Sequence, residues 1–354
     1  MEARNEFSKQ DAKSIALTVY GIKASAKRLD GECDFNFLLE TEIKSRYILK
    51  ISATDEDRKV VEMQNFALEW LDKANQPFQY PELIATMAKD SFGIGTVPGK
   101  SNLVRLFQYV PGILFNHDND RSDCKFTTFG TRLGELTNAL QGFKHEAVNR
   151  YLKWDLKQAA WIQEHLPVFV DADQQSCVAN FLETFNTCVK PMLHTLRKSV
   201  IHGDVNTHNT LVMDTPLGKP YVSGFIDFGD MVETPTICEL AIGMTYAMME
   251  HDDPFAAARM IVSHYHKQFP LQEAELDILF DLICIRLCIS VTSSALRKQA
   301  GTADAYALTS EGHAWRLLND FKQRDRCDIA REFKTATIRM GGAPVRAILF
   351  KKAK

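Results

Sequence analysis

The first third of the chain alternates short apolar runs with clusters of turn-forming residues, a pattern typical of an antiparallel sheet. Turns are expected at residues 29–34 and 42–45 and in the Gly- and Pro-rich stretch 92–100. The strands that this pattern predicts are residues 15–22, 35–40, 46–51, 81–88 and 102–110.

One helix is expected to interrupt this sheet, because apolar residues after the third strand recur at helical spacing. Thr54 is placed to cap it, and the acidic residues 55–57 would lie in its first turn, where the helix dipole favours negative charge. The apolar positions are Val60, Met63, Ala67, Trp70 and Leu71.

Beyond residue 110 the pattern becomes mainly helical. Pro111-Gly112 ends the last predicted strand and places the boundary between two lobes, residues 1–110 and 111–354. Pro191 is expected to kink one helix, and either Thr234 or Thr236 can cap another. The predicted helices are residues 129–140, 178–196, 237–249, 255–268, 273–298 and 305–323. The fold class is therefore α+β.

The length and composition of the chain limit the kinds of partner that it is expected to bind. A chain of 354 residues is long enough for two lobes, and its net charge of −3 provides no electrostatic footprint for nucleic acid or an anionic membrane. The N-terminus shows no apolar signal segment, and charges interrupt the most apolar helix, so we expect no membrane span and a cytoplasmic location. The eight cysteines form no C-x-x-C pair, which fits a reducing compartment.

Two polar clusters carry the candidate chemistry. His202-Gly203-Asp204 is followed by Asn209, and Ile226-Asp227-Phe228-Gly229 comes after a second apolar run. The turn-forming residues 214–220 predict a hairpin that brings Asp204, Asn209 and Asp227 to one end. This spacing matches a kinase catalytic loop and metal-binding turn, in which one Asp accepts a hydroxyl proton while an Asn and a second Asp hold magnesium. The alternative is that each residue is a cap or an Asx-turn.

Gly203 stands where protein kinases carry Arg, and in this respect the chain resembles the aminoglycoside phosphotransferase and choline kinase family. The resemblance implies a two-lobed protein-kinase-like fold, with an antiparallel sheet and one helix in the N-terminal lobe and a mainly helical C-terminal lobe. It also implies Mg²⁺ as the bound metal ion and GTP or ATP as the phosphate donor. Asp204 would be the catalytic base, and Asn209 and Asp227 would be the metal ligands. His202 and Glu239 would then support the loop.

The same template assigns the nucleotide contacts. Lys50 would grip the phosphates and Glu62 would hold it, with Glu56 and Glu69 as competing partners. The turn at residues 30–34 lies where a phosphate-covering loop is expected. The backbone of Gln108 and Tyr109 would form hydrogen bonds with the base of the nucleotide. The alternative is that Lys50 and Glu62 are ordinary surface charges.

Residues 227–237 leave no room for the activation segment of a protein kinase, so a small-molecule acceptor is expected. Asp230 and Glu233 are candidates to hold its ammonium group, and Arg286 or Arg297 to hold a carboxylate; each is otherwise a solvated charge. In residues 200–204, 209, 222–231 and 314–318 the chain most resembles the hydroxylysine kinase branch of this family. This resemblance implies 5-hydroxylysine as acceptor and GTP as donor. Homoserine, choline, ethanolamine and aminoglycosides remain alternative acceptors, and a non-catalytic nucleotide-binding protein is the rival class.

Overall fold

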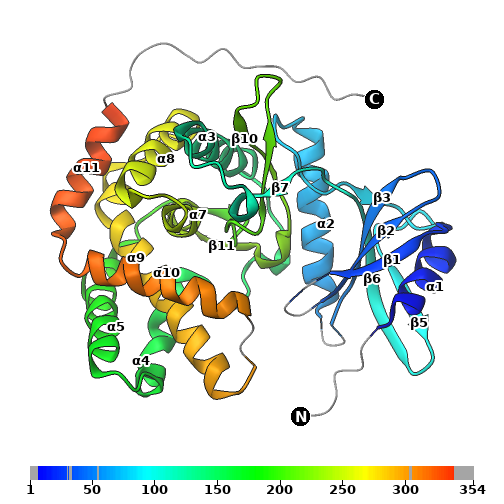
Figure 1. Cartoon of the computed structure of the whole chain (residues 1–354), viewed down its shortest axis with the longest axis horizontal. Helices are drawn as coiled ribbons and strands as arrows, with labels where there is room; N and C mark the ends of the chain where they lie inside the picture. Colours follow the sequence, from blue (N-terminus) through cyan, green and yellow to red (C-terminus); the bar gives the residue numbers. More distant parts are fainter. Residues whose placement is uncertain (1–6, 30, 32–33, 54–55, 303–304, 339–354) are drawn as a thin grey trace. The chain divides into compact units, whose positions relative to one another are not determined.

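A computed structural model describes residues 7–29, 31, 34–53, 56–302 and 305–338. These residues form two compact units (Figure 1). The first comprises the described residues up to Lys73, together with Gln79–Pro111 and His145–Ala147, and the second comprises Ala74–Phe78, Gly112–Lys144 and the described residues from Val148 onward. The assignment of nucleotide binding to residues 1–110 and of catalysis to residues 111–354 stays a prediction.

The first unit is built on one antiparallel sheet, as the sequence predicts. Its strands run in the order β1-β2-β3-β6-β4, and β5 also pairs with β6. The predicted strands 35–40 and 46–51 are confirmed as β2 and β3, which set Asn36 opposite Lys50. The bounds are β1 (Ser25–Leu29), β2 (Phe35–Glu40), β3 (Arg46–Ile51), β4 (Leu83–Ile84), β5 (Gly93–Val97) and β6 (Lys100–Gln108).

The strand predicted at residues 15–22 is wrong, because this segment belongs to helix α1 (Lys9–Tyr20). Ser8 and Asp11 form a capping box that starts the helix. The buried side chains of α1 are Ala12, Ile15, Ala16 and Tyr20, which is helical and not strand-like spacing. The described residues of the first unit therefore form two α-helices, α1 and α2 (Arg58–Lys73), and not the single helix predicted.

The turn predicted at residues 92–100 is confirmed only at residues 98–99, since Gly93–Val97 forms strand β5. A Cβ atom on Gly95 would stand 2.6 Å from a methyl group of Val104 and 3.0 Å from one of Ile15. The glycine is there because α1 packs closely against β5. The strand predicted at residues 81–88 shrinks to the two residues of β4.

Helix α2 (Arg58–Lys73) confirms the predicted helix of the first unit but begins later than expected. Asp57 precedes it, and the Asp57 carboxylate accepts a hydrogen bond from the backbone of Lys59 at 2.9 Å. The predicted cap at Thr54 lies outside the described residues. Trp70, expected on the buried face, is 39% exposed.

The second unit contains the predicted hairpin, formed by β9 (Thr210–Asp214) and β10 (Pro220–Phe225). Strand β7 (Ile113–Leu114) adds to the free edge of β9. A separate two-stranded ladder joins β8 (Lys198–Ile201) to β11 (Val232–Pro235). The two ladders fix both ends of each polar cluster, because the first cluster runs from β8 to β9 and the second from β10 to β11.

Helices make up the rest of the second unit. Every residue of α7 is buried, and it packs against α3, α8 and α9 (Figure 1). Thr236 is its N-cap residue by position, but its side chain makes no capping hydrogen bond. The helices are α3 (Asp123–Ala139), α4 (Ile162–His165), α5 (Ala172–Thr184), α6 (Lys190–Leu193), α7 (Ile237–Met249), α8 (Pro254–Gln268), α9 (Glu273–Gln299), α10 (Ala305–Phe321) and α11 (Arg326–Ile338).

Two features of this helical region differ from the prediction. The stretch predicted as one helix at residues 178–196 is divided by a π-helical turn at Phe185–Val189, and Pro191 lies in the first turn of α6, where its missing N–H costs nothing. Helix α11 was not expected. Its buried face is limited to Ile329, Ala330 and Phe333, which is a weak sequence signal.

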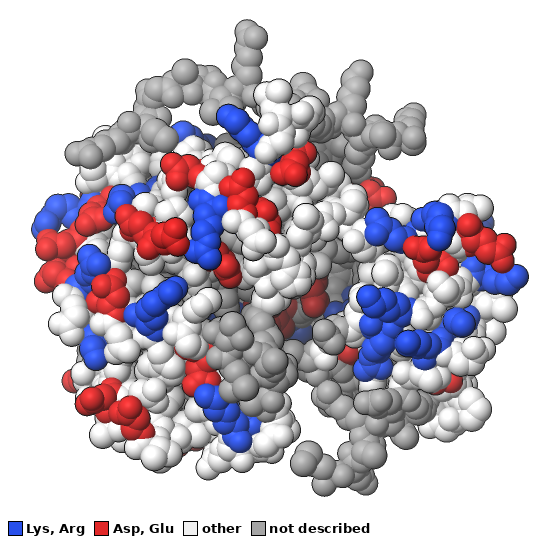
Figure 2. All heavy atoms as spheres, in the orientation of Figure 1, with Lys and Arg blue, Asp and Glu red and all other residues white. Residues whose placement is uncertain are grey.

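Helix α9 is long and apolar enough to cross a membrane, but 89% of its most apolar stretch is buried inside the second unit. It is therefore a core helix, as the charges within it predict. On the face shown in Figure 2, basic and acidic side chains occur on both units, and neither sign covers a whole unit.

Candidate active site

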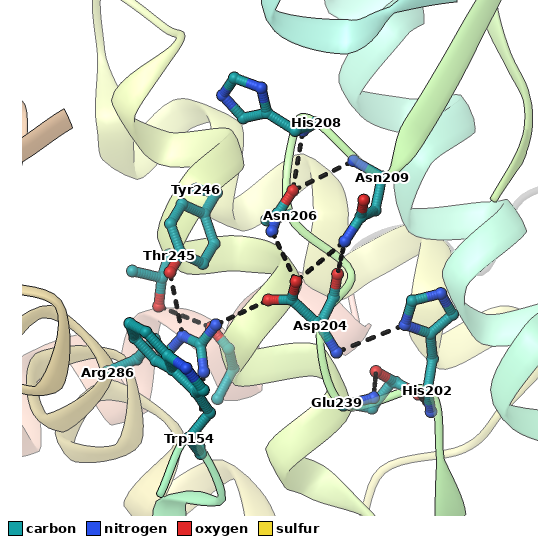
Figure 3. Close-up of polar contacts among 12 residues, drawn as sticks. Trp154, His202, Asp204, Asn206, His208, Asn209, Glu239, Thr245, Tyr246 and Arg286 are labelled. Carbon is teal, nitrogen blue, oxygen red and sulfur yellow. Dashed lines mark hydrogen bonds and ion pairs between the residues drawn. The ribbon is translucent and has the colours of Figure 1, made fainter. Parts of the chain in front are cut away.

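The loop between β8 and β9 presents Asp204, and its carboxylate is held by three side chains (Figure 3). Asn206 Nδ2 and Asn209 Nδ2 each donate to Asp204 Oδ2 at 2.9 Å. Arg286 donates to Asp204 Oδ1 at 2.8 Å. The side chain of Asp204 remains 24% exposed, so its carboxylate is fixed in orientation but open to a ligand.

Arg286 reaches Asp204 from the middle of α9 and is only 1% exposed. Its other nitrogens donate to the hydroxyl of Tyr246 at 3.2 Å and to the backbone carbonyl of Trp154 at 3.1 Å. The guanidinium also lies 4.8 Å from the centre of the Trp154 ring. A buried cation needs such partners. The predicted use of Arg286 to bind a substrate carboxylate is therefore corrected, because its guanidinium is engaged by Asp204, Tyr246 and Trp154.

Burial raises the pKa of Asp204 to about 7. The charge of Arg286 lowers it, and the charges of Asp230 and Asp227 raise it again. A carboxylate poised near neutral pH is suited to accept a proton from a hydroxyl group.

The second polar cluster forms a tight turn after β10. Asp227 adopts φ 61° and ψ 75°, a left-handed conformation that is costly for a residue with a side chain, and a short 3₁₀ helix follows at Phe228–Asp230. The backbone of Ile226 donates to the carbonyl of Asn209 at 2.9 Å, which joins the two clusters. The backbone on either side of this bond thus connects Asn209 to the residue directly before Asp227, which is exposed.

Asn209 and Asp227 carry oxygen atoms of the kind that a magnesium ion takes as ligands. Because the Asn209 amide nitrogen donates to Asp204, its oxygen faces elsewhere and can act as a ligand. In the part of the chain that the structure describes, no group of three or more His, Cys, Asp or Glu side chains could hold a metal ion. Two oxygen ligands suit Mg²⁺, which usually takes its remaining ligands from water and phosphate.

His202 and Glu239 connect the loop to its surroundings. His202 Nε2 is 3.0 Å from the carbonyl of Ile226, and its Nδ1 accepts from the backbone of Asp204 at 3.3 Å. Glu239, in α7, accepts from the backbone N–H groups of His202 at 2.6 Å and Gly203 at 3.2 Å. Burial raises the pKa of Glu239 to about 7, and these two hydrogen bonds lower it. Both residues lie where the sequence-based hypothesis of loop support places them.

The His202 contacts predict a pH-dependent stability. Burial lowers the pKa of His202 from 6.5 to about 4. The unfolded chain therefore takes up a proton at this residue below about pH 6.5, and the folded chain does so only near pH 4, so stability is lost as the pH falls through this window. Between pH 8 and pH 5 the loss should be about 2 kcal/mol.

Urea unfolding of the wild type and of His202→Gln at both pH values would measure this contribution. The wild type should lose about 2 kcal/mol more than the variant. His194→Gln, which removes an exposed histidine, is the matched control. The same pH dependence in wild type and His202→Gln would contradict the assignment.

Gly203 cannot be replaced by the Arg of protein kinases, and the structure gives the reason. Its φ is +81°, and a Cβ atom would stand 2.3 Å from the backbone carbonyl oxygen of Asp230. The glycine thus lets the loop that carries Asp204 and the turn after Asp227 approach each other closely.

Arg150 is a further support that sequence reasoning missed. Its Nε donates to the carbonyl of Met231 at 3.0 Å, and one of its terminal nitrogens donates to the carbonyl of Gly229. These bonds fix the backbone of the turn that follows Asp227. The sequence around Arg150 shows no motif that could have revealed the contact.

The prediction that Glu62 holds Lys50 does not match the ion pairs of the first unit. Lys50 pairs with Asp34 at 3.0 Å, and both side chains are largely buried. Glu62 instead pairs with Arg58 at 2.9 Å, one helical turn earlier in α2. Helical spacing makes Arg58 the nearer partner. Of the turn at residues 30–34, positions 30, 32 and 33 lie outside the described residues.

The predicted contact of the Gln108 and Tyr109 backbone with the nucleobase stays a prediction. The backbone N–H of Gln108 donates to Glu82 at 2.8 Å and that of Tyr109 donates to Arg46 at 3.1 Å, both inside the first unit. Either N–H group would have to give up this partner before it could donate a hydrogen bond to the base of a nucleotide.

The two candidate substrate carboxylates have different surroundings. Asp230 lies close enough to raise the pKa of both Asp204 and Arg286. Glu233 lies in β11 opposite Val200, and among the described contacts of the Asp204 cluster its carboxylate makes none. Asp230 therefore remains the better candidate for contact with a ligand.

An antiparallel N-terminal sheet, a helical second unit and a loop that holds Asp204 beside an Asn and a turn Asp define a protein with a kinase-like fold. The comparisons with known proteins agree with this class. The family model described as phosphotransferase enzyme family matches residues 25–272. The chain belongs to this family, and it is a phosphotransferase that acts on a hydroxyl group.

Its relatives are similar over nearly their whole length. The chain is 27% identical to hydroxylysine kinase of Danio rerio, over 94% of this chain and 98% of that protein. Among solved structures, amicoumacin kinase hAmiN in complex with AMP-PNP, Ca²⁺ and Ami has a TM-score of 0.66 at 15% identity, covering 89% of this chain and 94% of its own. A microcompartment-associated aminopropanol kinase also has a TM-score of 0.66, at 17% identity, covering 94% and 99%. These two structures confirm the predicted kinase-like fold.

Proposed function

We propose that this protein transfers the terminal phosphate of GTP or ATP, with Mg²⁺, to the side-chain hydroxyl of 5-hydroxylysine. The observation that carries the proposal is the Asp204 carboxylate, which is fixed by Arg286 and two Asn side chains and remains partly exposed. The similarity to hydroxylysine kinase over nearly the full length of both chains supports the acceptor and, with it, GTP as donor.

Each residue of the site has a defined task in this proposal. Asp204 accepts the proton of the acceptor hydroxyl, and the Asn206, Asn209 and Arg286 bonds keep its carboxylate in one orientation, so little reorganisation is needed when the reaction occurs. Asn209 and Asp227 hold the Mg²⁺, which supplies positive charge to the phosphate oxygens when bound. Lys50 binds the inner phosphates, and Asp34 is the carboxylate that orients it.

Steady-state kinetics with an acceptor panel tests the function. The panel is 5-hydroxylysine, homoserine, choline, ethanolamine and kanamycin, each with Mg²⁺ and either nucleotide, followed by release of nucleoside diphosphate. The kcat/KM for 5-hydroxylysine should exceed that for choline and kanamycin by orders of magnitude. If another acceptor is preferred, that acceptor replaces 5-hydroxylysine as the proposed substrate. If no acceptor is turned over, a non-catalytic nucleotide-binding protein is favoured.

The donor can be tested without turnover. A nucleotide at about 100 times its Kd should stabilise the folded protein by about 2.7 kcal/mol. Thermal unfolding with Mg²⁺ and equal concentrations of GTP or ATP should show the larger shift with GTP. A larger shift with ATP, together with faster turnover, would reverse the preference.

The remaining partner assignments are part of the same proposal. They are a cytoplasmic location and, as partners, a small-molecule acceptor and a nucleotide; solved structures of similar fold bind small molecules and nucleotides, which supports the partners.

A further inference from the structure

Lys125, in the first turn of α3, is a buried cation that the function proposed above does not use. Its side chain is only 2% exposed, and lysine is almost never buried to this extent unless its charge is paired. The ammonium group donates to the backbone carbonyls of Phe115 and Asp118 at 2.9 Å each, and to that of Asp120 at 3.1 Å. These three acceptors match the three donors of an ammonium group.

Two further groups surround the same ammonium. The carboxylate of Asp118 lies 3.3 Å from it, and the centre of the Phe115 ring lies 4.2 Å from it. Lys125 therefore fixes the backbone of the segment 115–120, whose own regular structure is the short 3₁₀ helix η1 (Phe115–His117). An uncharged side chain at position 125 would leave the three carbonyl oxygens without this donor.

The segment 115–120 contacts the loop that carries Asn209. The side-chain nitrogen of Asn116 lies 3.2 Å from His208 Nε2, and the backbone N–H of Asn116 donates to the carbonyl of Thr207 at 3.4 Å. The rings of His117 and His208 also meet edge to face, with their centres 6.4 Å apart. Thr207 and His208 directly precede Asn209 (Figure 3). The contacts thus reach the backbone immediately before the predicted metal ligand.

The chain beyond Asn209 is attached to the same part of the molecule. Leu114, at the end of β7, pairs with Leu211 in β9, two residues after Asn209. Within its own loop, Asn209 is held by Asn206, whose Oδ1 accepts from the backbone N–H groups of His208 at 2.8 Å and Asn209 at 3.1 Å. The position of Asn209 therefore depends on residues 114–117 on both of its sides, and Lys125 fixes this stretch from η1 onward.

We propose that Lys125 is a positioning residue for the metal site: its ammonium fixes the segment 115–120, and Asn116 transmits this order to Asn209. The inference rests on the proposed function, because that function makes Asn209 a ligand of Mg²⁺. Groups outside the ligand shell orient the ligands of a metal and alter its affinity. Lys125 acts in this way through two successive contacts and does not touch the metal, the nucleotide or the acceptor.

Lys125→Met tests the role of the charge, because methionine keeps a long unbranched side chain and removes the ammonium. The Mg²⁺ concentration needed for half-maximal turnover should rise at least about tenfold, the lower end of the effects of such outer groups. The KM of the acceptor, measured at saturating Mg²⁺, should change little. Lys190→Met, which removes an exposed lysine of α6, is the matched control and should change neither quantity.

A double-mutant cycle tests the path through Asn116. Asn116→Ala should also raise the required Mg²⁺ concentration, and adding Lys125→Met to it should raise the concentration little further, because both changes release the same contact. Leu140→Ala, which opens a cavity at the other end of α3, controls for loss of stability alone. It should lower the Tm without changing the Mg²⁺ requirement. Additive effects of Lys125→Met and Asn116→Ala, or an equal effect of Leu140→Ala, would overturn the proposal.

Hydrogen exchange of the protein without nucleotide separates this inference from the proposed function. Lys125→Met should speed amide exchange in residues 115–120 and also in residues 206–209, and Lys190→Met should speed neither. Faster exchange in residues 115–120 alone would overturn the coupling. If the wild type turns over no acceptor and exchange in residues 206–209 still depends on Lys125, the proposed function fails and the coupling stands. If turnover occurs and Lys125→Met changes neither exchange nor the Mg²⁺ requirement, the function stands and this inference fails.

Discussion

Replacing Asp204 with Asn should lower kcat for the acceptor by about 10²–10⁴, the usual contribution of a positioned proton acceptor. The Asn amide has nearly the same shape as the carboxylate, and its oxygen can still accept from Arg286. Its nitrogen then faces the donor nitrogens of Asn206 and Asn209, so these two hydrogen bonds are lost and thermal unfolding should be used to check that the variant folds. The amide cannot take up the hydroxyl proton. Single-turnover and steady-state rates would measure the loss, and nucleotide titration should show a nearly unchanged Kd.

The control for this experiment is Asn206→Ala, which removes one of the bonds to Asp204 Oδ2 and the two bonds that Asn206 Oδ1 accepts from the backbone of His208 and Asn209, but leaves the carboxylate in place. It should reduce kcat much less than Asp204→Asn, because Asn209 still donates to the same oxygen. A variant Asp204→Asn with normal kcat and weakened nucleotide binding would contradict the role of base.

The central residues of the site could be predicted because they lie in two short segments. The relative positions of Asp204, Asn209 and Asp227 depend on their spacing in the sequence and on one hairpin. A single sequence shows the spacing and predicts the hairpin. Arg286 is 82 residues from Asp204. In the sequence it is only a charge in an apolar helix, and nothing indicates whether it points to a substrate or to Asp204.

The errors in the first unit have a similar cause. The residues of α1 are apolar and β-branched enough to favour a strand, and the Ser8–Asp11 capping box that starts the helix lies before the apolar run. Gly93 and Gly95 read as turn formers, whereas their small size serves the packing of α1 on β5. Such close approach is a tertiary property that local composition does not encode.

Replacing Asp227 with Gly is expected to lower activity without lowering stability. Its left-handed backbone stores about 1–3 kcal/mol of strain that glycine would not carry. Asp227→Gly should therefore fold at least as stably as the wild type. Loss of the carboxylate should nevertheless reduce magnesium-dependent turnover by at least about 10²–10³, as for removal of one electrostatic partner of a transition state.

Asp227→Asn separates charge from conformation, because Asn tolerates the left-handed region and keeps the size of Asp. If the carboxylate binds Mg²⁺, Asn and Gly should both abolish the additional thermal stabilisation that Mg²⁺ gives to the nucleotide-bound protein, and raising the Mg²⁺ concentration should recover little activity. If the backbone conformation alone matters, Asp227→Asn should remain active and only Asp227→Gly should fail. Full activity of both variants would discard the metal assignment, and with it the reason for a strained residue at this turn.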